Sequence, residues 1–459
     1  MNRGIFREYD IRGVVGTDLT PEVVNHIGKA LGTMVARAGG AMVAVGYDAR
    51  TSSPSLFTAL TDGIVSTGVN VTSIGLVPTP LLYYAVHELA ADGGCMITGS
   101  HNPPEFNGFK MNLGTGSLYG DKIRQMLAMI EAHDFVVADR PGAVGVKDVI
   151  EPYIAMVRSK IALARPVKIV MDAGNGCGAV FAPRLMRALG AEVVELFCDV
   201  DGTFPNHHPD PTVPENLTDL IAKVRESGAE AGIAYDGDAD RIGVVDEKGN
   251  IIYGDMILAI FARDILARKP GAKIVFDVKC SQNLVDDIAA RGGVPLINPT
   301  GHSLIKARLV KEDAALAGEM SAHIFFRDDY YGFDDALYAT ARFLRIMAAN
   351  AAPVSTWLSD LPPVVNTPEI RVDCPDDEKF GVVERLVASF KADGEQVVDL
   401  DGARVAFPGG WGLVRASNTQ PVLVLRFEGD TAERLEEIRA RFLKKLRTIP
   451  LFASLDRLE

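Results

Sequence analysis

Three carboxylates stand at alternate positions in one short segment, Asp236-Gly237-Asp238-Ala239-Asp240-Arg241, which follows an apolar stretch of chain. Alternate residues of an extended or curved loop can point the same way, and three like charges held together are costly unless a cation neutralises them. Oxygen ligands suit Mg²⁺, Mn²⁺ or Ca²⁺ rather than zinc. Three protein oxygens leave an octahedral ion short of ligands, so a phosphate oxygen or a water would complete its shell.

Three other interpretations of this acidic segment fit less well. A polar turn of the Asp-Gly type rarely needs three acids in register. An EF-hand loop has Gly and a terminal Glu at positions that this segment does not match. Phosphatases that form an aspartyl phosphate place Thr or Val one residue beyond their second Asp, whereas Asp238 is followed by Ala239 and Asp240.

A serine stands in a second polar segment, Thr98-Gly99-Ser100-His101-Asn102-Pro103. The glycine lets the backbone bend sharply and expose the Ser100 hydroxyl, and free amides there could hold a phosphate. His101 can form a hydrogen bond or assist proton movement. Because the two residues are adjacent in sequence, a direct relay between them is geometrically awkward, which disfavours a hydrolase triad with Ser100 as a base-activated nucleophile.

Two further polar segments could bind a sugar and a phosphate. Glu319 and His323, four residues apart, suit sugar hydroxyls, although a capping Glu and a surface His are the usual roles of such residues. Arg415 stands beside hydroxyl and amide donors, and this combination matches a phosphate; the donors are Ser417, Asn418 and Thr419. Basic side chains near the four segments would meet an anionic substrate, namely Arg7, Arg12, Lys110, Arg241, Lys279 and Arg415.

The elements that must position these segments alternate between strand and helix, which is typical of a mostly parallel α/β sheet. The pattern predicts three rounds of such elements, over residues 42–97, 168–235 and 255–317. The last strand of each round runs into a polar loop, at 98–103, 236–241 and 318–323. Ligands gather beyond the carboxyl ends of strands in open parallel sheets, so the three loops could converge on one crevice.

After Pro362-Pro363 the pattern changes to short strands, tight turns and two helices, which indicates a mainly antiparallel sheet with helices on one face. The predicted fold is therefore three similar mixed α/β domains followed by a smaller α+β domain, around a central cleft. We expect a serine-loop domain at 1–150, a metal-loop domain at 151–252, a sugar-loop domain at 253–364 and a phosphate-binding domain at 365–459. The 459 residues exceed what one hydrophobic core supports.

Composition limits the classes of partner. The net charge of −13, from 47 basic and 60 acidic residues, argues against nucleic acid or an anionic membrane as the main partner. We found neither a membrane-length apolar stretch nor an apolar signal core near Met1, so a cytoplasmic location is expected. The five cysteines are scattered and lack CxxC spacing, which indicates neither a disulfide framework nor a zinc site.

Together with the segment Tyr9-Asp10-Ile11-Arg12-Gly13, the four polar loops resemble those of the α-D-phosphohexomutase superfamily, specifically its phosphomannomutase/phosphoglucomutase group. The resemblance covers essentially the whole chain. It implies that Ser100 carries a phosphoryl group and binds Mg²⁺ through a phosphoserine oxygen, with Asp236, Asp238 and Asp240 as the protein ligands. Arg241 would stabilise this loop and the substrate.

The resemblance also implies roles for the remaining candidates. Glu319 and Ser321 would contact the 3- and 4-hydroxyls of the sugar. A non-transferring phosphate would be held by Arg415, Ser417, Asn418 and Thr419. Lys110 and His302 match positions tied to proton transfer in the family, and the cleft would be lined by Tyr9, Arg12, Lys279 and His323.

The reaction so implied is reversible phosphoryl transfer between C1 and C6 of a hexose phosphate through a hexose 1,6-bisphosphate, by a monomer or weak homo-oligomer. Ala322 departs from the Gly that is usual in the group, and its methyl restricts the backbone. Met320 favours mannose and glucose substrates, since phosphoglucosamine mutases usually have Gln there. The alternatives are a phosphoglucosamine mutase and a sugar-phosphate-binding protein without catalysis. A fourth domain on a short linker is expected to open and close.

Overall fold

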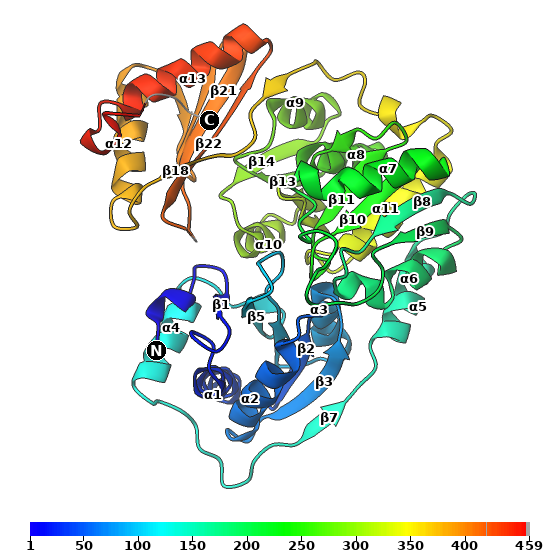
Figure 1. Ribbon diagram of the computed structural model, residues 1–459, viewed down its shortest axis with the longest axis vertical. Helices are drawn as coiled ribbons and strands as arrows, with labels where there is room; N and C mark the ends of the chain where they lie inside the picture. The colour runs from blue at the N-terminus through cyan, green and yellow to red at the C-terminus, as the bar shows by residue number, and fades with distance from the viewer. Residues whose placement is uncertain (419, 456–459) are drawn as a thin grey trace.

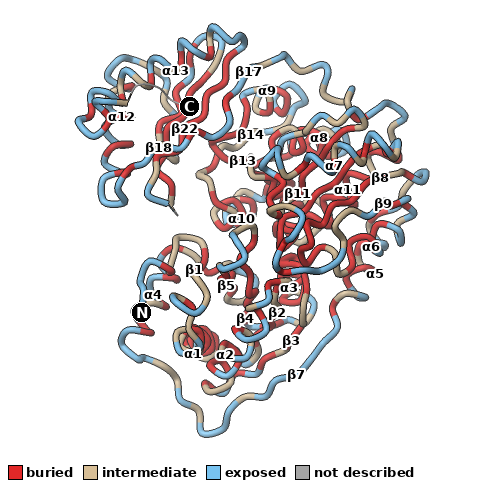
Figure 2. The backbone as a smooth tube through the Cα atoms, viewed as in Figure 1, coloured by how far each residue is buried: buried red, intermediate tan, exposed pale blue. Residues whose placement is uncertain are grey.

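The computed structural model describes residues 1–418 and 420–455 of the chain. Figure 1 shows the N-terminal part, in blue and cyan, and the C-terminal part, in orange and red, at the two ends of the molecule. The middle of the chain, in green and yellow, lies between them. Four separate sheets form within the described residues, and in Figure 2 their strands are mostly buried while connecting loops are exposed. The predicted order of three α/β domains and one α+β domain is confirmed.

The first sheet has the strand order β1-β5-β4-β2-β3-β7, with β6 paired to β5. Parallel pairing joins β2 to β3 and to β4, whereas β5 runs antiparallel to β4 and β1. The strands are β1 (Ile11–Val14), β2 (Met42–Tyr47), β3 (Asn70–Leu76), β4 (Gly93–Ile97), β5 (Phe106–Leu113), β6 (Gly116–Ser117) and β7 (Val144–Val146). The accompanying helices are α1 (Pro21–Arg37), α2 (Ser53–Val65), α3 (Thr79–Glu88) and α4 (Asp121–Glu131).

The second and third sheets repeat the centre of the first. Their strand orders are β12-β11-β10-β8-β9 and β14-β13-β15-β16. The second contains β8 (Lys168–Asp172), β9 (Glu192–Leu196), β10 (Ala231–Tyr235), β11 (Ile242–Asp246) and β12 (Ile251–Ile252), with helices α5 (Ile150–Lys160), α6 (Ala182–Ala188) and α7 (Thr218–Ser227). The third contains β13 (Lys273–Asp277), β14 (Val294–Asn298), β15 (Leu316–Gly318) and β16 (Ile324–Phe326), with helices α8 (Gly254–Arg268), α9 (Gln282–Ala290), α10 (His302–Lys311) and α11 (Ala336–Ala349).

In each of the three sheets, one strand after the parallel set returns antiparallel: β5 against β4, β11 against β10, and β16 against β15. The sequence interpretation ended each round at its polar loop, whereas the structure makes each loop the turn between a parallel strand and this returning strand. The returning strand matters for the site because β5 carries Lys110 directly opposite Met96 of β4. β5 was not predicted because its polar residues, including Asn107 and Lys110, interrupt the apolar runs by which the other strands were identified.

Five helices were not predicted from the sequence: α1, α4, α5, α10 and α11. Two of these helices begin with common N-terminal signals. Thr20 caps α1 ahead of Pro21, and Asp335 caps α11 by accepting from two backbone amides. In the second round, residues 177–188 do not form one continuous helix. Phe181, with φ −152°, separates a short 3₁₀ turn (Cys177–Val180) from α6.

The fourth sheet is antiparallel, with order β17-β22-β21-β20-β19 and β18 also paired to β22. It consists of β17 (Val365–Asn366), β18 (Ile370–Asp373), β19 (Gln396–Val398), β20 (Ala403–Phe407), β21 (Gly410–Ala416) and β22 (Val422–Gly429). Helices α12 (Lys379–Ala392) and α13 (Ala432–Leu446) pack on it. Two aromatic residues, Phe390 of α12 and Phe442 of α13, meet over the sheet with ring centroids 4.6 Å apart.

The hydrophobic cores do not follow the sheets one to one. A single cluster of buried side chains runs through the second and third domains and includes residues 81–86 of α3 in the first. The rest of the first domain and most of the fourth domain have clusters of their own, while Trp411 and Leu413 of β21 form a further small cluster with Val278 of the third domain. The fourth domain is therefore the part with the most independent core. Among the described residues, we found no helix that combines the length and the apolar character needed to cross a bilayer.

Candidate active site

Ser100 lies in the turn between β4 and β5 and is buried, with 1% of its surface exposed. Its Oγ donates to Asp236 Oδ2 over 2.9 Å and lies 3.0 Å from His101 Nδ1. Two expectations were thus wrong: the hydroxyl is not exposed, and adjacency does not prevent contact with His101. The reason is the left-handed backbone of Ser100, φ +50°, which turns the serine and histidine side chains toward each other.

Asp236, Asp238 and Asp240 follow β10 and are fully buried. One carboxylate oxygen from each lies within 4.8 Å of the others, as the alternating spacing predicted. Asp236 Oδ1 accepts from the amides of Asp240 and Arg241, so the loop curls around its first carboxylate. Ala239 permits this curl by taking φ +54°.

Two oxygens of this carboxylate cluster, Asp238 Oδ1 and Asp240 Oδ1, are buried and accept no hydrogen bond from the described residues. Burial and the charges of Asp240 and Asp238 raise the pKa of Asp236 well above its usual range. Unsatisfied, closely spaced carboxylate oxygens are a donor set that a hard divalent cation fits. The residues present therefore fit a divalent cation bound between the loop and the Ser100 hydroxyl.

Lys110 supplies part of the positive charge that this acidic loop needs. Its Nζ donates to Asp238 Oδ2 over 2.8 Å and also to Asp240 Oδ2. Burial by itself would lower the pKa of Lys110, but the two carboxylates outweigh that effect and raise it. Lys110 is thus protonated at neutral pH and joins the first domain to the second.

The third loop, between β15 and β16, is joined directly to the acidic loop. Arg241 Nε donates to His323 Nε2 over 3.0 Å, and the amide of Ile242 donates to the carbonyl of Ala322. Glu319 is buried and accepts from the Gly301 amide over 2.7 Å. Ser321 is half-buried in the same turn.

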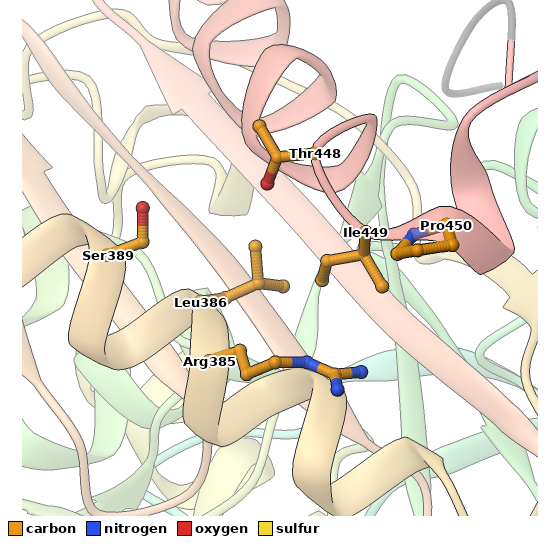
Figure 3. A pocket seen from close by; sticks show the side chains of 6 residues that line it. All are labelled: Arg385, Leu386, Ser389, Thr448, Ile449 and Pro450. Atoms are coloured by element: carbon orange, nitrogen blue, oxygen red, sulfur yellow. The ribbon is translucent and has the colours of Figure 1, made fainter.

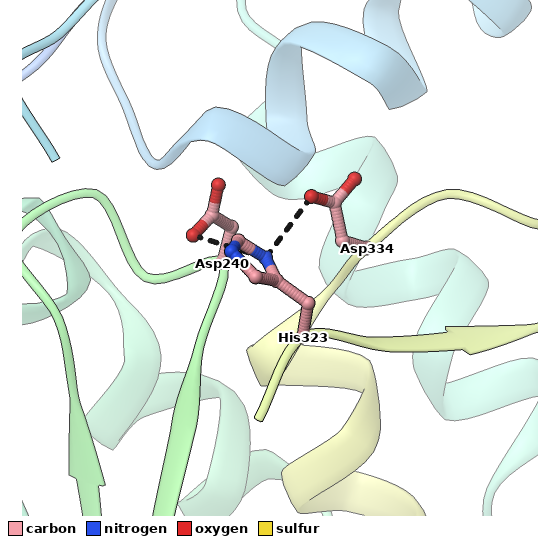
Figure 4. Close-up of side chains that lie close together, drawn as sticks. All are labelled: Asp240, His323 and Asp334. Carbon is pink, nitrogen blue, oxygen red and sulfur yellow. Dashed lines mark ion pairs between the residues drawn. The ribbon is translucent and has the colours of Figure 1, made fainter. Parts of the chain in front are cut away.

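The ring of His323 lies between two carboxylates, Asp240 and Asp334, and Figure 4 marks an ion pair from the ring to each of them. Arginine only donates, so the His323 Nε2 that it contacts must accept, and the proton of the neutral ring sits on Nδ1. That protonated nitrogen lies 3.2 Å from Asp334 Oδ2 and 3.5 Å from Asp240 Oδ1. A protonated nitrogen does not ligate a metal, so these three residues form a charge and hydrogen-bond cluster rather than a second cation site.

Asp334 and Lys306 were missed by the sequence reasoning. The Asp334 carboxylate is fully buried, with Lys306 Nζ at 2.9 Å and His302 Nδ1 at 3.6 Å. Burial by itself would raise the pKa of Asp334, but Lys306 and His323 hold it well below its usual range. His302 and Lys306 stand four apart on α10, a spacing that would have indicated one shared face had this helix been predicted.

His302 begins α10, next to the N-terminal segment of the chain. Burial, which outweighs the facing Asp334, lowers its pKa well below the ordinary value, so the ring is neutral at pH 7. Gly301 takes φ +133°, and a Cβ there would lie 2.5 Å from the Tyr9 ring. The glycine is thus required for the close approach of Tyr9, whose hydroxyl donates to the Thr300 carbonyl over 2.7 Å.

Arg12 and Asn418 connect the outer parts of the site. Arg12 Nη1 donates to Asn102 Oδ1 over 2.8 Å, which ties β1 to the serine loop. Asn418 Nδ2 donates to the Tyr9 hydroxyl over 2.5 Å, which brings the fourth domain into contact with the first. Arg7 is half-buried near the N-terminus, and its backbone amide bonds to Asp10.

The two other cations expected to bind phosphate are held by carboxylates. Arg415 Nε donates to Asp401 Oδ2 over 2.9 Å, and Lys279 Nζ donates to Glu369 over 2.6 Å. Ser417 accepts from the Gln420 amide. Thr419, the last of the predicted phosphate-binding residues, lies outside the described residues. The fourth loop thus contacts the first domain through Asn418, whereas Arg415 and Lys279 pair with carboxylates beside them.

A separate small pocket lies in the fourth domain, between α12 and the segment after α13 (Figure 3). It is lined by Arg385, Leu386, Ser389, Thr448, Ile449 and Pro450. Since no predicted site residue lines it, this pocket is not part of the candidate site.

Four domain families match consecutive stretches of the chain. They are described as phosphoglucomutase/phosphomannomutase alpha/beta/alpha domain I at residues 3–136, domain II at 151–249, domain III at 253–365, and the C-terminal domain at 369–445. Together they span most of the chain.

Individual proteins are similar over nearly their full length. A phosphomannomutase/phosphoglucomutase of Pseudomonas aeruginosa is 48% identical over 445 residues, which is 97% of this chain and 96% of that protein. A phosphoglucomutase of Neisseria gonorrhoeae is 47% identical over 452 residues, 98% of each chain. The crystal structure of a phosphoglucomutase/phosphomannomutase family protein from Burkholderia thailandensis superposes with a TM-score of 0.93 at 45% identity, covering 100% of this chain and 99% of that one.

Proposed function

The chain belongs to the phosphoglucomutase/phosphomannomutase family, and from this premise we propose that it transfers a phosphoryl group reversibly between C1 and C6 of mannose or glucose phosphates. It is an isomerase that acts as an intramolecular phosphotransferase. The phosphoryl group passes through Ser100, and a hexose 1,6-bisphosphate is the intermediate.

One observation carries this proposal. The buried Ser100 Oγ lies 2.9 Å from Asp236, beside two carboxylate oxygens that lack any hydrogen-bond donor among the described residues. Buried carboxylate oxygens without donors are costly unless a cation binds them, and a hydroxyl beside such a cation is well placed to carry a phosphoryl group. The arrangement supports a resident phosphate carrier better than a base-activated hydrolytic serine.

Asp236, Asp238 and Asp240 would hold Mg²⁺ together with an oxygen of phosphorylated Ser100. The bound ion would neutralise charge on the phosphoryl group and orient it. Lys110 and Arg241 contribute further positive charge around the same carboxylates, with Arg241 Nε 4.0 Å from Asp236. Transfer between oxygens depends mainly on positioning and on such charge neutralisation.

In the first half-reaction the Ser100 Oγ–P bond breaks and a P–O bond forms to the sugar hydroxyl. The hydroxyl proton needs an acceptor, and the returning Ser100 oxygen needs a proton. Neutral His302 can accept a proton, whereas Lys110, which is already charged, serves as a charge partner and donor. His101 Nδ1, at 3.0 Å, can supply or accept the proton of the Ser100 hydroxyl.

The bisphosphate must then turn over within the site. Glu319 and Ser321 contact the sugar hydroxyls, and His323, Tyr9 and Arg12 line the space around them. The non-transferring phosphate is held by Lys279, Arg415, Ser417, Asn418 and Thr419. One hydroxyl-binding loop and one phosphate-binding loop accept both orientations, because each orientation presents the same kinds of group.

The test uses purified protein with Mg²⁺ and a hexose 1,6-bisphosphate primer. We expect conversion of glucose 1-phosphate and mannose 1-phosphate to the 6-phosphates, with glucosamine 1-phosphate as the comparison substrate. Ser100→Ala should abolish turnover and the one-phosphoryl mass increase seen in the wild type. Chelation of the metal should stop turnover, and added Mg²⁺ should restore it. Absence of turnover of either sugar, with Ser100→Ala indistinguishable from wild type, contradicts the proposal.

A further inference from the structure

Arg50 lies beneath the serine loop, and its side chain is completely buried. A guanidinium has five N–H donors, and here each has an acceptor. Nε donates to Asp48 Oδ2 over 3.2 Å. Nη1 donates to the carbonyls of Pro103 and Phe106, and Nη2 donates to those of Ser100 and Asn102, over 2.5 to 3.0 Å. One side chain therefore binds four carbonyl oxygens of the loop that carries Ser100.

The conformation of Ser100 is one that needs such support. A residue with a Cβ rarely adopts φ +50°, and the bond from Nη2 to the Ser100 carbonyl fixes the peptide that follows it. On the other side of the loop, Asp48 Oδ2 accepts from the Gly99 amide over 3.1 Å. The Asp48–Arg50 pair thus holds the backbone both before and after the serine.

Neighbouring residues also pack closely against Arg50. A Cβ on Gly99 would lie 2.4 Å from Arg50 Nε, so the glycine is needed for close packing against the guanidinium. From the second domain, the Phe204 ring lies 5.2 Å from Arg50 Cζ. Gly202 packs against the same backbone, since a Cβ there would lie 2.3 Å from the Ala49 carbonyl oxygen.

We propose that Arg50 is a positioning residue for the phosphoryl carrier. By binding the carbonyl oxygens of the loop, it fixes the rotated backbone in which Ser100 Oγ faces Asp236. The positive charge of Arg50 is balanced by Asp48, so its contribution is geometry rather than attraction for substrate phosphate. This inference rests on the proposed function of Ser100.

Arg50→Lys keeps the charge but offers three donors in place of five, so it cannot hold all four carbonyls. We expect kcat to fall about 100-fold, the scale of a catalytic group misplaced by about 1 Å, with KM within about threefold of wild type. The matched control is Arg342→Lys, which alters another arginine with a fully buried side chain that pairs with Asp328. The control should share any loss of thermal stability but keep kcat.

A second variant protects the test against misfolding of Arg50→Lys. Gly99→Ala keeps the arginine but puts a methyl group 2.4 Å from Arg50 Nε, so the guanidinium must shift, and it should lower kcat with little change in KM. Phosphorylation of Ser100 by the bisphosphate, followed by intact mass, should be slower in both variants than in wild type. A wild type without turnover overturns the proposed function. If the wild type is active, two results overturn the role of Arg50. One is that folded Arg50→Lys or Gly99→Ala keeps a kcat within about threefold of wild type. The other is that Arg342→Lys is equally impaired.

Discussion

Around Ser100, the decisive contacts are made by single charged atoms inside the protein. Lys110 Nζ touches two of the three loop carboxylates, and the third accepts from Ser100 itself. Removing one member of such a buried group leaves charges that water cannot reach. Changes to Lys110 or to the three loop carboxylates should therefore affect both the stability of the protein and its binding of a cation.

Lys110→Met should destabilise the protein by about 3 kcal/mol, because Asp238 and Asp240 lose their buried partner. The three carboxylates then depend more on a metal ion, so added Mg²⁺ should raise the melting temperature of the variant more than that of wild type. Thermal unfolding with and without Mg²⁺ measures both effects.

The matched control is Lys160→Met, which removes a partly exposed partner of Asp329 and should cost no more than about 1 kcal/mol. Equal responses of wild type and Lys110→Met to Mg²⁺ would show that the carboxylates are not the cation site.

Among the elements, the turns between parallel and returning strands carry the site. The three turns each contain one residue with a left-handed backbone although none of these is glycine: Ser100, Ala239 and Ala322. Ala322, at φ +66°, takes the left-handed conformation that glycine adopts more easily. These turns hold strain close to the reacting groups.

Ala322→Gly should relieve this strain and stabilise the protein by about 0.5 to 1 kcal/mol, the balance between left-handed strain and the greater freedom of an unfolded glycine. Because Ala322 lies between Glu319 and His323, we also expect a changed KM for the sugar phosphate. Thermal unfolding and steady-state kinetics measure the two effects.

Ala90→Gly is the matched control, since Ala90 has φ +47° at the exposed end of α3. It should gain similar stability without any kinetic change. A loss of stability in Ala322→Gly would mean that the alanine methyl contributes packing that exceeds the strain.

For the whole molecule, the question is how the fourth domain is attached. Its main core is separate, and its contacts to the third domain combine a small apolar cluster of Val278, Trp411 and Leu413 with polar contacts. Arg404 donates to the carbonyls of Val278 and Cys280, and Arg426 donates to that of Lys279. The Lys279–Glu369 pair adds a charged link at the same boundary. An attachment of this kind suits a domain that opens to let the bisphosphate turn.

Glu369→Gln should weaken this attachment at neutral pH. Lys279 lowers the pKa of Glu369 to about 2, against an ordinary value of 4.5. Because the pKa of Glu369 is lower in the folded than in the unfolded protein, the ionised carboxylate stabilises the fold above about pH 4.5. This stabilisation is lost as the pH falls from about 4.5 through about 2. After discounting for partial exposure, the pair contributes about 1 to 2 kcal/mol. Denaturant unfolding of the fourth domain, followed by Trp411 fluorescence, should show a difference that is constant from pH 7 to about 5 and shrinks below.

Asp399→Asn provides the comparison, because Asp399 pairs with Lys391 in a half-exposed bridge and its loss should cost less stability than the loss of the Lys279–Glu369 pair. A Glu369→Gln difference that grows as the pH is lowered would contradict the assigned direction of the pKa shift. Small-angle scattering of both variants at pH 7 should show larger dimensions for Glu369→Gln alone.

Local chemistry and periodicity were enough to predict the three α/β rounds, the antiparallel fourth domain and the polar loops at strand ends. The acidic loop, the serine loop and the sugar loop were found because their residue types are unusual at that spacing. Elements with mixed polarity, such as β5 and α10, were not found. Their polar faces point into the site rather than to solvent, so the usual alternation is disturbed.

The sequence by itself determined which groups could do chemistry, because residue type and spacing are local properties of the chain. Only the tertiary structure decided that Ser100 is buried, that Arg50 holds its loop, and that Asp334 and Lys306 lie beside His302 and His323. These facts depend on contacts between segments that are tens to hundreds of residues apart. Such contacts follow from how the domains pack, and no local pattern of residues encodes that packing.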